Sequence, residues 1–336
     1  MIHSTGSTTL STVAKTCLSC RVQHQLLALI LTLVYASVLT SLPQLEFLDR
    51  DNYLTYARYS DEILTRYVER GPMSVLFNEP LWLLINIGLS KLFASETVLS
   101  ILIFVPAFLV SWLMLRHNPQ HFCWMIAILL IPQVIKNHII HLRQGLGLAI
   151  FLLGYFSSSK WRGRTLMLAA CFVHASFIFI GLIFASVHVI GQLRLSPRLR
   201  TIILLLCFCV VGVMAGTVAS LLGARQGDGY SNLQASTSGL GFLFWAMAMG
   251  IFLSAGRNFL QAHMVSLAIV AFYLSTYFTL PVTARIFESG LLLVLMSGFA
   301  LPGWRRQTFL LLVLSYALIH YGTQLGRPWL GWGLYR

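Results

Sequence analysis

Long apolar runs follow one another along almost the whole chain, and they decide what it can fold into. A membrane-crossing helix needs about 20 mostly apolar residues, somewhat fewer where the crossing is short or irregular. We find eleven candidate segments, at residues 26–43, 79–94, 97–115, 122–136, 142–158, 165–190, 199–222, 239–256, 262–280, 286–301 and 307–324. The sequence therefore predicts an all-α fold, a polytopic transmembrane helical bundle of about 9–11 membrane segments, with residues 1–336 forming a single transmembrane domain.

The proportion of charged residues supports this class. Only 10% of the residues are charged and 57% are hydrophobic, whereas about 25% of the residues in soluble domains are charged. A soluble chain of 336 residues could not bury so much apolar surface. The composition therefore excludes a soluble protein.

The charged residues are also unevenly distributed. The chain has 23 Lys and Arg against 10 Asp and Glu, a net charge of +13, and seven of the ten acids lie within residues 46–79. Excess Lys and Arg marks the cytoplasmic side of a membrane protein. No nucleic-acid-binding motif accompanies the basic residues, so we predict no nucleic-acid partner. The clusters expected in the cytoplasm are Lys15 with Arg21, Lys160 with Arg162 and Arg164, Arg194 with Arg198 and Arg200, Arg257, and Arg305 with Arg306.

These clusters predict the course of the chain. Residues 1–25 form a cytoplasmic N-terminal tail ahead of an uncleaved first span, and residues 44–78 form an amphipathic collar on the outer side. Strict alternation of all segments puts one basic cluster outside, so two segments must be irregular. We expect residues 79–94 to be interfacial or re-entrant, and residues 165–190 to enter the membrane and return to the same side. The outer side then carries the polar stretches 44–79, 137–144 and 225–230, and Arg285.

The strongest candidate for chemistry is the polar stretch 136–144. Arg143 and Gln144 open the apolar run that follows, so free backbone N–H groups and a guanidinium meet there and favour an anion site. Two other interpretations stay open: a loop at the membrane border with a snorkelling arginine, or a metal site at His138 and His141, for which the spacing gives no third ligand. We predict no metal and no cofactor, since no nucleotide-binding glycine motif occurs.

Other polar residues have two interpretations each. His174 is either a hydrogen-bonded core residue or a proton shuttle or donor to a sugar. Arg285 either pairs with Glu288 one turn later or faces an outer cavity. Arg225 and Tyr230 border a glycine-rich stretch that is either simply flexible or part of the site. The collar adds carboxylates and tyrosines that are either solvated or functional, namely Asp49, Tyr53 and Glu79.

Taken in order, these motifs resemble the EpsG family of Wzy-type polysaccharide polymerases. The ordered features are an acid with a tyrosine four residues later, a Glu-Pro pair, an Asn with an Arg-Gln pair, a His-x-Ser, and a late arginine before an apolar run. In this chain they are Asp49 with Tyr53, Glu79 with Pro80, Asn137 with Arg143 and Gln144, His174 with Ser176, and Arg285. They span residues 47–290, most of the chain, and the ordered set is fairly specific although each motif alone is weak.

The resemblance implies a bacterial inner-membrane glycosyltransferase with a GT-C-like bundle, a periplasmic collar and an active site that faces the periplasm. Such polymerases join oligosaccharide repeat units carried on undecaprenyl pyrophosphate. Membrane lipids and a chain-length regulator protein are further expected partners. The candidates for the base that takes the proton of the acceptor hydroxyl are Asp49, Glu79, His141 and His174. Substrate binding, with Arg143 and Arg285 on the pyrophosphate, is expected from Tyr53, Asn137, Arg143, Gln144, Arg225, Tyr230 and Arg285.

Four other classes of protein stay open on the sequence. A flippase or transporter of lipid-linked oligosaccharides would use the same basic cavity without chemistry, although we find no pair of matching interrupted segments of the kind common in transporters. An O-antigen ligase would use the same donor with another acceptor. A membrane O-acyltransferase would also use an intramembrane histidine, and a purely structural subunit needs neither an acidic collar nor a buried histidine.

Overall fold

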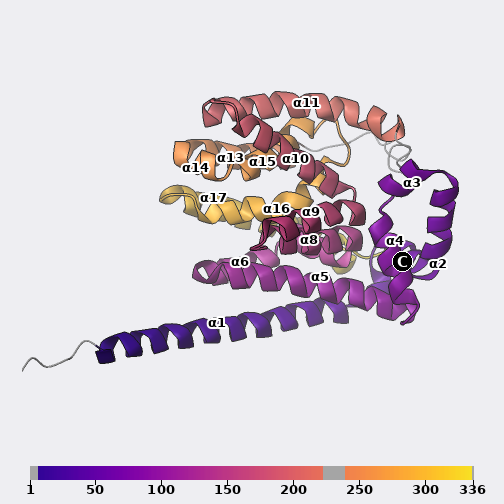
Figure 1. The fold of residues 1–336 in the computed structure, drawn as a ribbon, viewed down its shortest axis with the longest axis horizontal. Coiled ribbons are helices and arrows are strands. Elements are labelled where there is room, and N and C mark those ends of the chain that lie inside the picture. Colours follow the sequence, from indigo (N-terminus) through magenta and orange to yellow (C-terminus); the bar gives the residue numbers. More distant parts are fainter. Residues whose placement is uncertain (1–6, 222–238, 335–336) are drawn as a thin grey trace, which may run out of the picture.

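The chain is built from helices (Figure 1). The computed structural model describes residues 7–221 and 239–334. These residues include no strand, only an isolated antiparallel β-bridge between Phe47 and Gly333, so the predicted all-α class is confirmed for them. The helices in chain order are α1 (Ser7–Ser41), η1 (Gln44–Glu46), α2 (Arg50–Glu69), α3 (Pro72–Phe77), α4 (Pro80–Ser90), α5 (Ser95–His117), η2 (Pro119–His121), α6 (Phe122–Leu129), α7 (Pro132–Ile139), α8 (Leu142–Tyr155), α9 (Lys160–Val173), α10 (Ser176–Gly191), α11 (Pro197–Leu221), α13 (Leu240–Ser254), α14 (Arg257–Ala262), α15 (Met264–Thr276), α16 (Thr283–Phe299), α17 (Trp304–Gln324) and η3 (Pro328–Gly331).

Several helices have the length and composition of membrane spans. In the described part of the chain, three qualify: Val22–Ser41 within α1, the whole of α5, and Pro197–Met214 within α11. A fourth span is possible at the bent pair formed by Pro119–Leu129 and α7. The two helices meet at an angle of 69° across a short break, and together they are long and apolar enough to count as one span. Five further apolar helices are shorter, namely α4, α8, α10, α13 and α15. A membrane protein is therefore supported, while the count of 9–11 segments stays a prediction.

Breaks inside apolar runs explain why many helices are short. Pro132 opens α7 directly after α6, and a proline lacks the backbone N–H that would continue a helix. His174 has extended backbone angles (φ −151°, ψ 128°) and divides the expected segment 165–190 into α9 and α10. The expected segment 79–94 holds only the 11 residues of α4. Segments 165–190 and 79–94 are the two for which the distribution of basic residues predicted an irregular course through the membrane.

One end of the bundle carries the basic residues. His24 of α1 contacts the carbonyl of Leu115 near the end of α5 at 3.3 Å, and the rings of His117 and Phe156 stack at 4.2 Å, so the ends of α5 and α8 meet there. Arg305 donates to Ser254 at 3.0 Å, which joins the start of α17 to the end of α13. Basic residues lie at or near the end of α5 and at the starts of α9, α14 and α17, namely Arg116, Lys160, Arg257, Arg305 and Arg306.

The acidic collar lies at the other end. In Figure 1, α2 and α3 lie where α1 ends, and α1 begins at the opposite side of the picture. Residues near the C-terminus join this end: the indole of Trp329 donates to the carboxylate of Glu46 at 2.6 Å. Two backbone bonds add to this link, from Leu48 N–H to the Trp332 carbonyl at 2.9 Å and from Leu334 N–H to the Glu46 carbonyl at 2.8 Å. The start of the collar is therefore held by a segment almost three hundred residues away in sequence.

Glycines bring the central helices unusually close. A Cβ on Gly154 of α8 would lie 2.7 Å from the carbonyl oxygen of Gly163 of α9, and a Cβ on Gly163 would lie 2.8 Å from that of Gly154. Small residues permit such backbone contact between membrane helices. The α8–α9 pair carries Arg143 and His174 at its other end.

Candidate functional site

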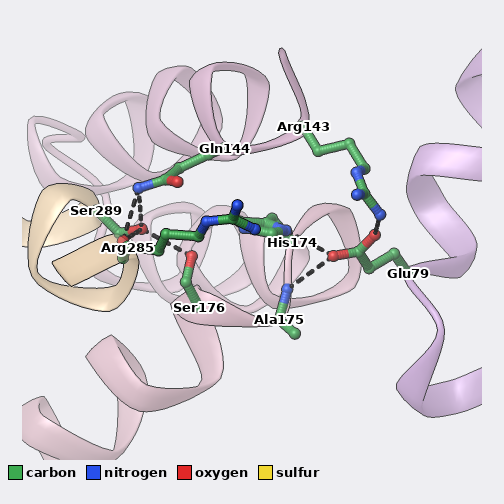
Figure 2. Close-up of polar contacts among 8 residues, drawn as sticks. All are labelled: Glu79, Arg143, Gln144, His174, Ala175, Ser176, Arg285 and Ser289. Atoms are coloured by element: carbon green, nitrogen blue, oxygen red, sulfur yellow. Dashed lines mark hydrogen bonds and ion pairs between the residues drawn. The ribbon is translucent and has the colours of Figure 1, made fainter. Parts of the chain in front are cut away.

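Glu79 is the centre of the candidate site. It precedes Pro80 at the start of α4 and has a left-handed backbone conformation (φ 59°, ψ 54°), which is rare for a residue other than glycine. Its side chain is 6% exposed. One carboxylate oxygen accepts from Arg143 Nη1 at 2.5 Å, and the other contacts His174 Nδ1 at 2.5 Å and accepts from the Ala175 N–H at 3.3 Å (Figure 2).

The groups around Glu79 hold it in the ionised form. Burial of the carboxyl favours its neutral form, but the positive charge of Arg143 and the electrostatic effect of His174, together with the hydrogen bonds from His174 and Ala175, outweigh burial and hold the pKa of Glu79 well below its usual range. A carboxylate stabilised in this way is a weak proton acceptor. Glu79 is therefore better suited to orient its two partners than to act as a base.

Arg143 is held by aromatic residues as well as by Glu79. It lies in the first turn of α8, and its guanidinium carbon is 5.3 Å from the centre of the Tyr56 ring of α2, in the range of a cation–π contact. It also interacts electrostatically with the hydroxyl of Tyr53. Both tyrosines pack edge-on against the fully buried Trp82 of α4. The collar therefore forms one wall of the Arg143 environment.

A second set of hydrogen bonds extends the site to α16. Ser176 and Ser289 share a hydrogen bond of 2.7 Å, and the amide of Gln144 donates to the Ser289 hydroxyl at 3.0 Å and to the Arg285 carbonyl at 2.7 Å. His174 and Ser176 thus point to different partners, one to the collar and the other to α16 (Figure 2). Because the helix breaks at His174, neighbouring residues contact different helices. His174 contacts Glu79 before α4, which also binds Arg143 of α8, and Ser176 contacts Ser289 of α16.

The turn between α7 and α8 is anchored on both sides. Asn137 donates to the Glu288 carbonyl at 3.5 Å, and the buried Arg50 of α2 donates to the Ile139 carbonyl. Burial lowers the pKa of Arg50 to about 10, so it stays protonated at neutral pH. Two of its nitrogens, Nε and Nη1, have no hydrogen-bond partner among residues 7–221 and 239–334. Glu288 pairs with Lys136 at 3.5 Å, so the pair with Arg285 that the spacing allowed is not formed.

Two basic groups beside this network remain without partners. The exposed Arg285 side chain makes no hydrogen bond or ion pair within the described residues, and in Figure 2 it extends from α16 in the direction of His174. His141 is 9% exposed, and its Nε2 has no hydrogen-bond partner in the part of the chain that the structure describes. Four basic side chains act electrostatically on His141, namely Lys136, Arg143, His174 and Arg285. Three of these side chains are paired with Glu79 or Glu288, so the charge of Arg285 is left unbalanced among the described residues and favours an anion.

Most of the predicted site residues are brought together. The hydrogen-bonded and ion-paired network, with the aromatic wall, includes Tyr53, Glu79, Asn137, Arg143, Gln144 and His174, with His141 and the side chain of Arg285 beside it. Asp49 is an exception: it is exposed at the start of α2, and its side chain makes no capping hydrogen bond. Arg225 and Tyr230 lie outside the described residues. In the described part of the chain, no three His, Cys, Asp or Glu side chains are grouped as metal ligands.

Sequence reasoning missed three contributors. Ser289 connects Gln144 with Ser176, Tyr56 lies against Arg143, and Arg50 holds the Ile139 carbonyl. Ser289 follows Glu288 one turn after Arg285, so its position beside a predicted site residue was the available signal. Nothing local distinguishes Tyr56 from the other collar tyrosines.

Replacing Gly145 by alanine is expected to destabilise the site. A Cβ there would overlap the backbone carbonyl of Asn137, which cannot move without displacing the α7–α8 turn. We expect a loss of about 1–3 kcal/mol in the free energy of unfolding, typical of overpacking, measured by thermal unfolding of the purified protein in detergent. Gly250→Ala is the matched control, because a Cβ on Gly250 would meet nothing within 4 Å. Equal unfolding temperatures for the two variants would contradict the close contact.

Comparisons with known proteins add no relative. No family model matches the chain, and neither a curated protein nor a solved structure matches it. The function is therefore argued from the residues and their geometry.

Proposed function

We propose that this chain is a Wzy-type polysaccharide polymerase, a glycosyltransferase of the bacterial inner membrane whose active site faces the periplasm. It would join oligosaccharide repeat units carried on undecaprenyl pyrophosphate, using a GT-C-like bundle of about 9–11 membrane segments. The observation that carries the proposal is the cluster of Glu79, Arg143 and His174, which lies at the collar end of the bundle with Arg285 beside it. Basic residues gather at the opposite end, which supports the orientation.

The arrangement suits transfer of a glycan from a lipid pyrophosphate. The hydroxyl of the incoming lipid-linked unit attacks the anomeric carbon of the growing chain. The bond from that carbon to the pyrophosphate oxygen breaks, and its electron pair leaves with undecaprenyl pyrophosphate. Arg285 and Arg143 lie where they can neutralise the charge that develops on this leaving group. Because Arg285 forms no ion pair among the described residues, its charge is available to the substrate.

His174 is the group best placed to take the proton of the acceptor hydroxyl. Its Nδ1 faces the Glu79 carboxylate, which fixes the ring orientation and leaves Nε2 as the proton-accepting nitrogen of the neutral ring. Glu79 also stabilises the imidazolium that forms when the proton is transferred. Among the four predicted candidates for the base, this geometry favours His174 over Glu79, which is held ionised, and over the exposed Asp49.

Reconstitution tests this function directly. The purified protein is placed in liposomes with an undecaprenyl-pyrophosphate-linked repeat unit, and the products are separated by length. A ladder of glycans longer than one unit supports the polymerase. Transfer of the lipid-linked unit across the bilayer without elongation would indicate a flippase, and transfer only to a different acceptor would indicate a ligase. Either result would overturn the proposal.

Replacing Arg285 by glutamine is expected to lower the elongation rate by roughly 10²–10³-fold, the usual loss when one preorganised group that stabilises developing charge is removed. Because the side chain is exposed and makes no hydrogen bond or ion pair among the described residues, stability should change little. The rate of ladder formation and the unfolding temperature are measured together. Arg257→Gln, at the other end of the bundle, is the matched control. A normal rate in Arg285→Gln would remove this arginine from the site.

A further inference from the structure

A pocket lies within the bend of α2, next to the Glu79 site. Tyr59 has non-helical backbone angles (φ −129°, ψ 21°) that bend the helix near its middle. A cavity of about 270 Å³ is lined by residues from both sides of this bend, namely Asn52, Thr55, Tyr56, Ile63, Arg66, Tyr67 and Arg70. Sites for whole small molecules usually measure about 300–1,000 Å³. The pocket therefore has room for one part of a larger ligand, of about the size of a sugar ring.

The lining combines the groups that recognise sugars. Tyr56 and Tyr67 are buried and contribute aromatic surface, against which the C–H face of a sugar ring packs. The Asn52 amide can donate to and accept from sugar hydroxyls, and the Thr55 hydroxyl, which donates to the Asp51 carbonyl at 2.8 Å, can accept from one. A purely apolar ligand would leave the Asn52 amide without a ligand partner, and the pocket therefore favours a carbohydrate.

Two arginines give the pocket a positive charge. The ion pairs among the described residues are Arg58 with Glu96, Lys136 with Glu288, and Glu79 with Arg143 and His174, so neither Arg66 nor Arg70 is paired. Arg66 donates through Nε to the Glu62 carbonyl at 3.3 Å, which leaves its terminal nitrogens available. No acidic residue lines the cavity. Guanidinium groups bind carboxylates through paired hydrogen bonds, so the expected sugar carries a carboxylate.

Tyr56 belongs to both the pocket and the candidate active site. It lines the cavity, and its ring also lies 5.3 Å from the guanidinium carbon of Arg143. A glycan with its reacting end near Arg143 can therefore extend a neighbouring sugar into the bend of α2. We propose that this pocket binds a carboxylate-bearing sugar of the substrate glycan, and this inference rests on the proposed polymerase function.

Binding without turnover tests the proposal. A tetrasaccharide that contains glucuronic acid is titrated into the full-length protein in detergent by calorimetry, beside the same tetrasaccharide with its carboxyl groups reduced to alcohols. We expect the acidic form to bind at least about tenfold more tightly, as loss of charge-assisted hydrogen bonds predicts. The variant Arg66→Gln/Arg70→Gln should lose this preference. Arg58→Gln, on the same helix but paired with Glu96 and outside the pocket, should keep it.

Three results would overturn the assignment. They are equal binding of the acidic and reduced forms, an unchanged preference in Arg66→Gln/Arg70→Gln, and tight binding of inorganic pyrophosphate that the same double substitution abolishes, which would make this a phosphate site. The experiment does not depend on catalysis. If elongation is absent while the acidic preference depends on the two arginines, the polymerase fails and the sugar pocket stands. If elongation occurs and the preference is missing, only the pocket assignment fails.

Discussion

Replacing Glu79 by glutamine is expected to destabilise the protein and to abolish glycan elongation. The substitution leaves the guanidinium of Arg143, whose side chain is 14% exposed, without its counter-ion. Breaking a buried ion pair by removing one partner costs about 3–5 kcal/mol. We expect this loss in the free energy of unfolding, measured by thermal or chemical unfolding in detergent. Glu96→Gln, which breaks the exposed pair with Arg58, is the matched control and should change stability by less than about 1 kcal/mol.

The double variant Glu79→Gln/Arg143→Gln separates stability from catalysis. Removing both charges takes away the uncompensated guanidinium, so the double variant should be clearly more stable than the sum of the two single losses predicts. Elongation should nevertheless stay absent, because the orienting carboxylate and the cation are both gone. Strict additivity of the two losses would mean that the ion pair at Glu79 does not couple these residues.

Replacing His174 by asparagine is expected to lower the turnover number by about 10²–10⁴-fold, the usual contribution of a general base. The asparagine amide can still donate to Glu79, so the packing around the carboxylate should be largely kept. The initial rate of elongation is measured as a function of donor concentration. A lower kcat at unchanged KM supports a role in the chemical step.

The control for this substitution is His188→Asn, on the exposed surface of the same α9–α10 hairpin. It should leave both kinetic parameters unchanged. If His174→Asn instead raises KM and leaves kcat unchanged, His174 binds the substrate and another residue is the base. His141, with its unpartnered Nε2, would then be the next residue to substitute.

The sequence contained most of the residues of the site but not their pairing. Glu79 is 64 positions from Arg143 and 95 from His174, so no spacing within a helix could show that they meet. Asp49 lies in the collar and Glu79 directly follows it, and composition treats the two acids alike. They differ because Pro80 starts a helix that carries Glu79 inward to the bundle, whereas Asp49 stays exposed at the start of α2.

The helix boundaries show a similar division. Hydropathy locates the apolar segments well, because burial in a bilayer or a core requires apolar residues in either case. It does not locate a break such as the one at His174, where the neighbouring residues are as apolar as the helices beside them. The charge pattern did indicate that segments 79–94 and 165–190 were irregular. Basic clusters indicate which side of the membrane a loop occupies, so they show where a segment does not cross fully, even though they say nothing of its local conformation.

The link between Glu46 and Trp329 has a consequence for the order in which the protein matures. These partners are 283 residues apart, so the collar leaves the ribosome long before the segment that holds its first residues has been made. During synthesis the contacts of Glu46 and Leu48 with this segment can form only after residues 329–334 have been made. A chain that stalls before residue 329 therefore lacks the link between the start of the collar and the C-terminal segment.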